Sequence, residues 1–296
     1  MPFIKYPEIE NSYRQKFIDD FLFHNPSAKD NKYVAQIKLD GSNVQFIFEP
    51  DKEMKIGKRS SFIGNDNFNG IQEIKHKYQK IFDYLQSYAD KNNHYINVYG
   101  EIYGKGIQKR IYYGDDKYIS FFDIRVDGKL LSYFEITEMF DDIVLNNFVE
   151  TVGPFNYEDI FNLDLPDNHE GLVVKPYNKV NPEERSLYLK IKSDKFKEKG
   201  DKSKKKKTKK ESDPEIEHLK EIYLSLINKN RLYSVFSKEG EIETPSQIGQ
   251  YIKIVTDDVV NDFKKEIDIE NYDRKKIGEV YKSGNAKIVE LLKEFL

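Results

Sequence analysis

The sequence predicts an α+β domain followed by a small all-helical domain, with a lysine-rich stretch between them. Three observations lead to this prediction. Short β-rich runs alternate with helical patterns at first, a lysine-rich stretch follows, and only helical patterns come after it. At about 150 residues per domain, a length of 296 residues also favours two domains. We therefore expect domains at 1–196 and 214–296, joined by a linker at 197–213.

Two kinds of pattern predict the elements of the first domain. Apolar residues between Ile71 and Tyr88 recur about every 3.6 residues, which predicts an amphipathic helix. A second helix is predicted from near Ile136 toward Phe148. Branched and aromatic residues gather in six short runs that predict strands. These runs are Tyr33–Lys38, Val44–Glu49, Tyr95–Tyr99, Tyr118–Val126, Gly171–Lys175 and Leu187–Ile191.

The linker and the second domain follow from a change of composition. From Lys195 to Lys210 there are ten lysines against two acidic residues, a local charge of +8 in a chain of net charge −3. Such a run cannot bury a face, so we expect it to be exposed. Beyond it, one helix is predicted at Ile216–Leu226, another opens at Thr244 and runs to Phe263, and one or two more lie between Ile277 and Phe295.

Composition excludes several classes of protein. The chain has no cysteine, which excludes disulfides, a thiolate zinc site and a cysteine nucleophile. Its five histidines are scattered without ligand-like spacing, so no structural metal is expected. The first ten residues contain acids where a signal peptide needs an apolar stretch, and no window approaches 18 apolar residues. We expect a cytoplasmic protein without a membrane partner.

The sharpest local feature is the segment Ile37–Asn43, which lies between two predicted strands. One interpretation is a β-hairpin that turns at Asp40-Gly41. The other is a nucleophilic Lys38 at the end of a strand, with its approach opened by Gly41. An unperturbed lysine is neutral in only about one molecule in 2,500 at pH 7, so a lysine nucleophile needs nearby cations or burial.

Three later segments carry candidate partners for this lysine, and each has an alternative. Lys190 and Lys192 alternate with apolar residues, so they share a face: either an edge strand guarded by lysines or two ammonium groups facing a phosphate. Glu170 and Lys175 bound a run that also fits an ordinary buried strand. Glu101 lies near glycines that would let a ligand approach, although no phosphate-binding loop or dinucleotide fingerprint is present.

Together and in this order, the segments resemble the motifs of the covalent nucleotidyltransferases. That superfamily comprises ATP-dependent DNA ligases, RNA ligases and mRNA capping enzymes. The matching motifs span 155 residues and are Lys38-x-Asp40-Gly41, Glu101, Phe121-Phe122-Asp123-Ile124, Glu170-Gly171-x-Val173-x-Lys175 and Lys190-x-Lys192. Five motifs in the right order argue against a chance match.

Further segments resemble the type 2 RNA ligases, the double-strand-repair class. They are Lys5–Asn11, Gly100–Gly104 followed by Ile107–Lys109, and Tyr113-Gly114 leading into Phe121–Ile124. DNA ligases and capping enzymes end in a β-rich domain, whereas type 2 RNA ligases carry a small helical one. One departure is Asp40, because the family often has histidine there and aspartate is usual in DNA ligases and capping enzymes.

The resemblance implies a fold, an activity and partners. The fold is an α+β nucleotidyltransferase domain of antiparallel sheets with flanking helices, plus a helical C-terminal domain. The activity is ATP-dependent sealing of 3′-OH/5′-phosphate nicks in duplex RNA, through a lysyl–AMP on Lys38 and an adenylylated 5′ end. Mg²⁺ or Mn²⁺ is the implied cofactor. Nicked duplex RNA is the implied partner, an RNA/DNA hybrid is a further candidate, and the protein is expected to be a monomer.

The resemblance also implies roles for the phosphate-binding residues. Lys190 and Lys192 would bind the α-phosphate that Lys38 attacks. Lys175 would serve the same phosphate site. Asn43 would help to position the phosphate or the nick.

The remaining roles concern the metal and the nucleoside. Glu170 and Asp40 would hold the metal, since Mg²⁺ prefers carboxylate and phosphate oxygens. Glu101 and Arg59 would contact the ribose. Phe122 would stack on adenine.

Two alternatives stay open for the base and for the function. Phe121 replaces Phe122 in the stacking role if the register differs by one residue. Separately, Phe122 could be a plain core aromatic with no contact to the base. A DNA ligase or a capping guanylyltransferase would share these motifs. A catalytically silent nucleic-acid-binding protein would explain the basic linker, because phosphate contacts dominate affinity for nucleic acids.

Overall fold

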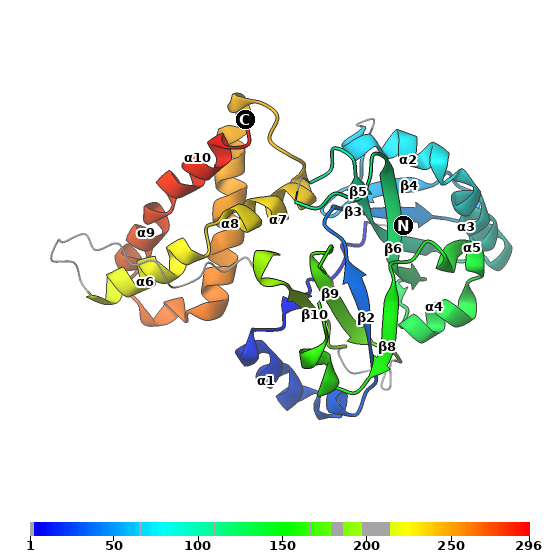
Figure 1. Ribbon diagram of the computed structural model, residues 1–296, viewed down its shortest axis with the longest axis horizontal. Coiled ribbons are helices and arrows are strands. Elements are labelled where there is room, and N and C mark those ends of the chain that lie inside the picture. Colours follow the sequence, from blue (N-terminus) through cyan, green and yellow to red (C-terminus); the bar gives the residue numbers. More distant parts are fainter. Residues whose placement is uncertain (1–2, 65–66, 109, 166, 179–185, 197–213) are drawn as a thin grey trace. The chain divides into compact units, whose positions relative to one another are not determined.

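A computed structural model describes residues 3–64, 67–108, 110–165, 167–178, 186–196 and 214–296 (Figure 1). The chain divides into two compact units, Met1–Lys195 and Phe196–Leu296. The linker predicted at 197–213 lies outside the described residues. Among the helices within these ranges, none is both long and apolar enough to cross a membrane.

The first unit is built on two five-stranded sheets. The first sheet has the order β1 (Glu10–Asn11), β10 (Leu189–Lys192), β9 (Gly171–Pro176), β2 (Tyr33–Lys38) and β8 (Thr151–Phe155). The second has the order β4 (Lys55–Lys58), β3 (Ser42–Phe48), β5 (Ile96–Gly104), β6 (Lys117–Val126) and β7 (Lys129–Leu130). Every strand pair is antiparallel except β1 with β10. The predicted α+β domain of antiparallel sheets is confirmed.

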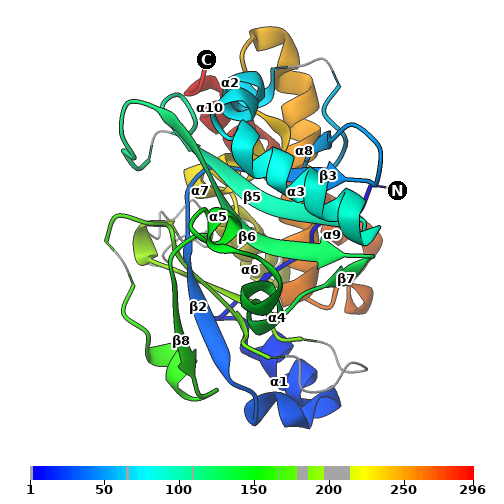
Figure 2. The same ribbon diagram turned by 90° about the vertical axis from the view of Figure 1, so that its right-hand side faces the viewer.

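The chain passes from one sheet to the other directly after Lys38. Strand β2 pairs with β8 and β9, whereas β3 pairs with β4 and β5, so the hairpin interpretation of Asp40-Gly41 is wrong. In Figure 2, β2 and β8 run in a different direction from β5 and β6, as two separate sheets allow. A Cβ atom at Gly41 would overlap the carbonyl oxygen of Ile102 on β5, so only glycine fits this crossing. Lys38 therefore lies where the two sheets meet.

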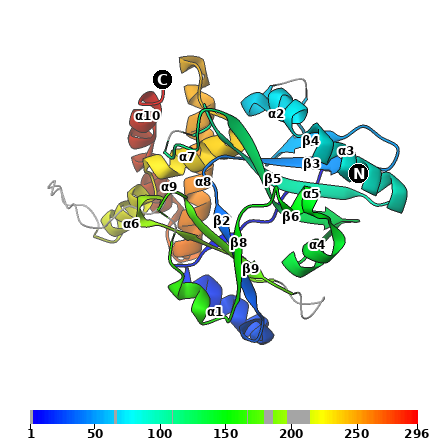
Figure 3. The same cartoon turned by 45° about the vertical axis from the view of Figure 1, so that its right-hand side comes forward.

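Helices cover one face of each sheet (Figure 2, Figure 3). The helix predicted at 71–88 is two helices, because the backbone at Tyr78 leaves helical geometry (φ −105°, ψ 15°). The helix predicted toward Phe148 is likewise divided, into α4 and α5. The helices of this unit are α1 (Gln15–His24), α2 (Ile71–Lys77), α3 (Gln79–Asn92), α4 (Tyr133–Met139) and α5 (Asp142–Leu145).

Two hydrophobic cores hold these helices on the sheets. Phe46 of β3 packs on Phe82 of α3 with ring centroids 4.6 Å apart, and the same cluster includes Phe121 of β6. Ile18 of α1 belongs to the other cluster, together with Tyr33 of β2. The polar motif residues are left to the opposite sheet faces.

The second unit is helical, as predicted. Its helices are α6 (Pro214–Ser225), α7 (Lys229–Glu239), α8 (Ile248–Glu266), α9 (Arg274–Ser283) and α10 (Asn285–Lys293). Tyr223, Val255, Val259 and Phe263 form the centre of its core. The sequence patterns missed α7 here, and in the first unit they missed α1 and the strands β1, β4, β7 and β8.

Candidate active site

Three neighbouring strands bring Lys38, Glu170 and Lys192 together. Lys38 on β2 and Lys192 on β10 both lie opposite Gly171 on β9. Residues opposite one another on neighbouring strands point to the same face, so the two lysines approach from either side of the residue that precedes β9. That residue is Glu170. Its Oε1 accepts from Lys192 Nζ at 2.6 Å, and its Oε2 forms an ion pair with Lys38.

The charge state of Glu170 follows from these contacts. Burial alone would raise the pKa of this carboxyl, but Lys192 and Lys38, helped by Arg110, bring it down to about 2. Backbone bonds fix the position of Glu170 as well, because its N–H donates to Lys38 O at 3.0 Å. The site therefore holds one buried carboxylate between two cations.

The structure corrects one interpretation of Lys190 and Lys192. Strand β10 lies between β1 and β9, with Lys190 opposite Asn11 on one side and Val173 on the other, so it is not an edge strand. The side chain of Lys192 is only 5% exposed, which also excludes a surface guard against aggregation. Lys190 shares its face of the sheet with Lys38 and Lys192.

The second sheet contributes Asn43 and Glu101, which lie opposite each other on β3 and β5. Burial raises the pKa of Glu101 to about 8, a shift that Lys38 and Arg59 oppose and that Glu170 increases. The buried Oδ1 of Asn43 has no hydrogen-bond donor within the described part of the chain. A buried acceptor without a donor is rare in proteins, and it fits a ligand that brings hydroxyl groups, such as a ribose.

Asp40 is bound by a residue that sequence reasoning missed. Arg110 donates Nε to Asp40 Oδ2 at 3.0 Å and Nη2 to Asp40 Oδ1, and the backbone N–H of Asp40 donates to the hydroxyl of Tyr113 at 3.0 Å. Burial raises the pKa of Asp40, while Arg110 opposes the rise. Because Arg110 lies 70 positions along the chain from Asp40, no spacing pattern indicates the pair.

A β-bulge separates the roles of Phe121 and Phe122. Gly100 pairs with Phe121 and Tyr99 pairs with Asp123, so Phe122 has no partner in the register. Phe121 is fully buried in the helix-covered core. Phe122 remains partly exposed on the other side. The structure thus places Phe121, the alternative stacking residue, in the core. Adenine stacking by Phe122 stays a prediction.

Lys175 lies away from Lys38. It is opposite Val34 on β2, four residues along β9 from Gly171, which corresponds to about 13 Å of strand. Its ammonium pairs with Asp123 and donates to Phe122 O at 2.6 Å. The structure brings Lys38, Asp40, Glu101, Glu170 and Lys192 into one electrostatic cluster, but not Lys175.

Tyr6 and Asp123 are further residues whose contacts sequence reasoning did not foresee. The hydroxyl of Tyr6 donates to the carboxylate of Asp123, and its ring packs edge-on against Phe122 at 5.1 Å. The buried Asp123 therefore joins the N-terminal segment to Lys175 beneath the predicted adenine site. Both residues belong to matched motif segments, but their contacts cross 117 positions of sequence.

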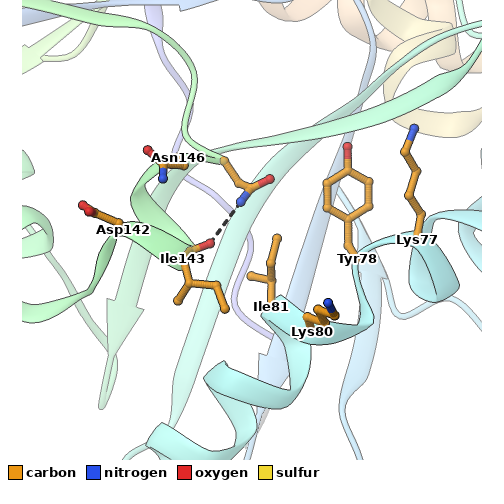
Figure 4. A pocket seen from close by; sticks show the side chains of 8 residues that line it. Lys77, Tyr78, Lys80, Ile81, Asp142, Ile143 and Asn146 are labelled. Carbon is orange, nitrogen blue, oxygen red and sulfur yellow. Dashed lines mark hydrogen bonds between the residues drawn. The ribbon is translucent and has the colours of Figure 1, made fainter.

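A cavity of about 410 Å³ lies elsewhere, where the α2–α3 junction faces α5 (Figure 4). Its lining is Lys77, Tyr78, Lys80, Ile81, Asp142, Ile143, Asn146 and Asn147. It contains none of the predicted site residues. Lys77 is already paired with Asp116 at 2.5 Å.

Comparisons with known proteins agree with the geometry. A family model described as RNA ligase matches residues 31–213, and one described as T4 RNA ligase 2 C-terminal matches residues 209–290. A Naegleria gruberi RNA ligase structure with PPi shares 19% identity at a TM-score of 0.51 and covers 66% of this chain. A variant of that ligase with ATP and Mn shares 17% at 0.50, with the same coverage.

These matches fix the family and the fold. Each match spans 58% of the Naegleria chain, so this chain spans little more than half of that length. At such identities the likeness shows the fold alone, which is the predicted nucleotidyltransferase architecture. The first family model matches well over half of the present sequence, and the second matches its helical unit. The chain therefore belongs to the RNA ligase family, and the resemblance of its motifs to the type 2 RNA ligases is confirmed.

Proposed function

We propose that this protein is an ATP-dependent RNA ligase that seals 3′-OH/5′-phosphate nicks in duplex RNA. The observation that carries the proposal is the group of Lys38, Glu170 and Lys192 at the junction of two sheets, in which Glu170 and Lys192 are buried and Lys38 stays partly exposed. In a chain of the RNA ligase family, this group supplies a nucleophile, a carboxylate and a phosphate-binding cation in one place.

In the first step, Lys38 Nζ attacks the α-phosphorus of ATP. Before the attack the Lys38 ammonium gives one proton to water, which frees its lone pair. A P–N bond then forms while the bond from the α-phosphorus to pyrophosphate breaks, and pyrophosphate leaves. Lys192 and Lys190 share the face of Lys38, so we propose that they bind the α-phosphate and stabilise its charge in the transition state. The later steps pass AMP to the RNA 5′-phosphate and then join that end to the 3′-OH.

No group of three or more acidic or histidine side chains among the described residues could hold a metal by itself, so a divalent cation here would take most of its oxygen ligands from the triphosphate and water. We propose that Glu170 holds it, which requires Lys38 or Lys192 to release its oxygen of this carboxylate when ATP binds. A bound Mg²⁺ or Mn²⁺ would neutralise charge on the triphosphate. A metal role for Asp40 stays a prediction, because Arg110 bonds both of its oxygens in this structure.

The nucleoside is assigned to the second sheet. Glu101 and Arg59 are proposed for the ribose, and the unpartnered Oδ1 of Asn43 supports a ligand at this place. Phe122 is proposed for the adenine, because its ring is partly exposed and its neighbour Phe121 is taken up by the core.

Labelled nucleotides and nicked duplexes test the proposal. We expect covalent labelling with ATP but not with GTP, and faster sealing of a nick flanked by RNA than of the same nick in DNA. Labelling with GTP would favour a capping enzyme. Preference for nicked DNA would favour a DNA ligase. This is the second candidate because Asp40 occupies a position where aspartate is usual in DNA ligases. Absence of any covalent label would contradict the proposed function.

A further inference from the structure

The connection between β5 and β6 is longer than a hairpin between two adjacent antiparallel strands needs. Residues 105–116, here called the strap, join two adjacent antiparallel strands with twelve residues, whereas about two to five are enough for a hairpin. Its base is closed, because Lys105 N–H donates to Asp116 O at 3.0 Å. Ile107 is buried in the core of the second sheet. Long connections without secondary structure are commonly functional.

One contact of the strap reaches the turn that follows Lys38. The planar guanidinium of Arg110 binds both oxygens of Asp40, and the two side chains are 11% and 2% exposed. A fork of this kind fixes direction as well as distance, which a lysine cannot do. A carboxylate as buried as that of Asp40 needs such a partner.

A second contact of the strap reaches both sides of the site. The hydroxyl of Tyr113 accepts from the backbone N–H of Asp40 at 3.0 Å. Its ring stacks on His169, with centroids 5.9 Å apart and planes 25° apart, and meets Tyr103 edge-on at 5.1 Å. His169 directly precedes Glu170. The strap therefore touches the residue before the carboxylate and the turn after the nucleophile.

We propose that Arg110 is a positioning residue for Lys38. Acting through Asp40, it holds the turn after Lys38 against the strap, while Tyr113 ties the same strap to the end of β9 that carries Glu170. In this proposal the Asp40 carboxylate binds Arg110 and does not bind the metal. This inference rests on the proposed function, because it concerns the approach of Lys38 to ATP.

A double-mutant cycle tests whether the two residues act as one unit. The variants are Arg110→Gln, Asp40→Asn and both together, and the readout is the single-turnover rate constant of covalent AMP labelling. We expect each single change to lower the rate constant at saturating ATP by about ten- to a hundred-fold, with ATP half-saturation nearly unchanged. The double variant should match the slower single variant, because neither residue acts without the other.

Several results would overturn the inference. Multiplied effects in the double variant would show that Arg110 and Asp40 act independently of each other. A raised metal requirement in Asp40→Asn, but not in Arg110→Gln, would make Asp40 a metal ligand. Normal labelling rate constants in both single variants would show that the strap does not position Lys38. If the unchanged protein takes no AMP, the proposed function fails instead.

Controls separate positioning from folding. Tyr112 lies on the same strap but is 77% exposed, so Tyr112→Ala should label at the normal rate. Partial unfolding lowers the amplitude of a single-turnover reaction and leaves its rate constant unchanged. If Arg110→Gln fails to fold, Arg110→Lys keeps the charge without the fork, and a normal rate constant there would contradict the inference.

Discussion

Both units bury a cluster of charged side chains, and the two clusters differ in how well they are balanced. In the helical unit Arg231, which is 3% exposed, donates Nη1 to Asp258 at 2.8 Å and to Asp262 at 2.6 Å. Its Nε donates to Leu226 O at 3.3 Å, and Lys238 binds the other oxygen of Asp258 at 2.8 Å. Each charge in this cluster is met by a partner within it.

The cluster around Lys38 is not balanced in this way. Burial holds the pKa of Glu101 at about 8, and the Oδ1 of Asn43 is buried without a donor from the described residues. Such features cost stability, and proteins keep them mainly at functional sites. The comparison teaches that buried ion pairs alone do not mark a site; the cluster around Lys38 differs by a carboxyl whose pKa burial raises and by a buried acceptor without a donor from the described residues.

The largest effect should come from removing the nucleophile. Lys38→Ala and Lys38→Arg should abolish covalent AMP labelling, because arginine stays protonated and cannot attack. Sealing of RNA that is already adenylylated should survive, since that substrate bypasses the step. Loss of both AMP labelling and the sealing of adenylylated RNA would mean that the substitution damages the whole site. The role of Lys38 in the first step alone would then be contradicted.

Glu170→Gln should have the next largest effect. It removes the charge that Lys38 and Lys192 share, so we expect the labelling rate constant to fall by about 10²–10³-fold. Glu138→Gln, the same substitution at an exposed residue of α4, is the matched control. If Glu138→Gln slows labelling as much as Glu170→Gln does, the effect does not belong to the site.

Arg231→Met should separate the two clusters by affecting stability alone. Removing Arg231 takes a buried partner from Asp258 and Asp262, which keep Lys238 and Lys265, so we expect a cost of about 1–3 kcal/mol in the free energy of unfolding. Denaturant unfolding measures this loss. The rate constant of AMP labelling should stay unchanged, and a slower reaction would show that the balanced cluster also serves catalysis.

The smallest effect concerns pH. The folded-state pKa of Glu101 is raised above its ordinary value, so its contribution favours folding at low pH and is lost as pH rises from about 4.5 through 8. The pKa of Glu170 is lowered, so its contribution is lost as pH falls from about 4.5 toward 2. Unfolding free energies of Glu101→Gln should therefore vary less between pH 5 and 8 than those of the unchanged protein. If the unfolding free energies of both proteins changed equally with pH, the Glu101 carboxyl would be solvated and its pKa would not be raised by burial.

Much of the fold could be predicted because apolar periodicity is local. The six strand runs and the helical tail follow directly from it. Tyr78 continues the apolar stripe, however, so the break between α2 and α3 leaves no trace in the pattern. The Asp40-Gly41 pair favours a hairpin locally, and only the pairing of whole strands decides that β2 and β3 enter different sheets.

The candidate site was predictable where chemistry fixes residue types at short spacings. Lys38, Glu101, Glu170 and Lys192 were singled out because their short motifs, in this order, resemble those of the covalent nucleotidyltransferases, and the structure brings the four residues together. Arg110 was not, because its partner depends on how a long connection folds back. Such partners become visible only when the chain is folded.

The central claim is that Lys38 becomes covalently linked to AMP. Peptide mapping by mass spectrometry, after incubation with ATP and a divalent metal without RNA, tests it most directly. We predict one AMP adduct per chain, on the peptide that contains Lys38 and on the Lys38 side chain itself. An adduct on any other residue, or an unmodified Lys38 in protein that still seals RNA with ATP, would contradict the account.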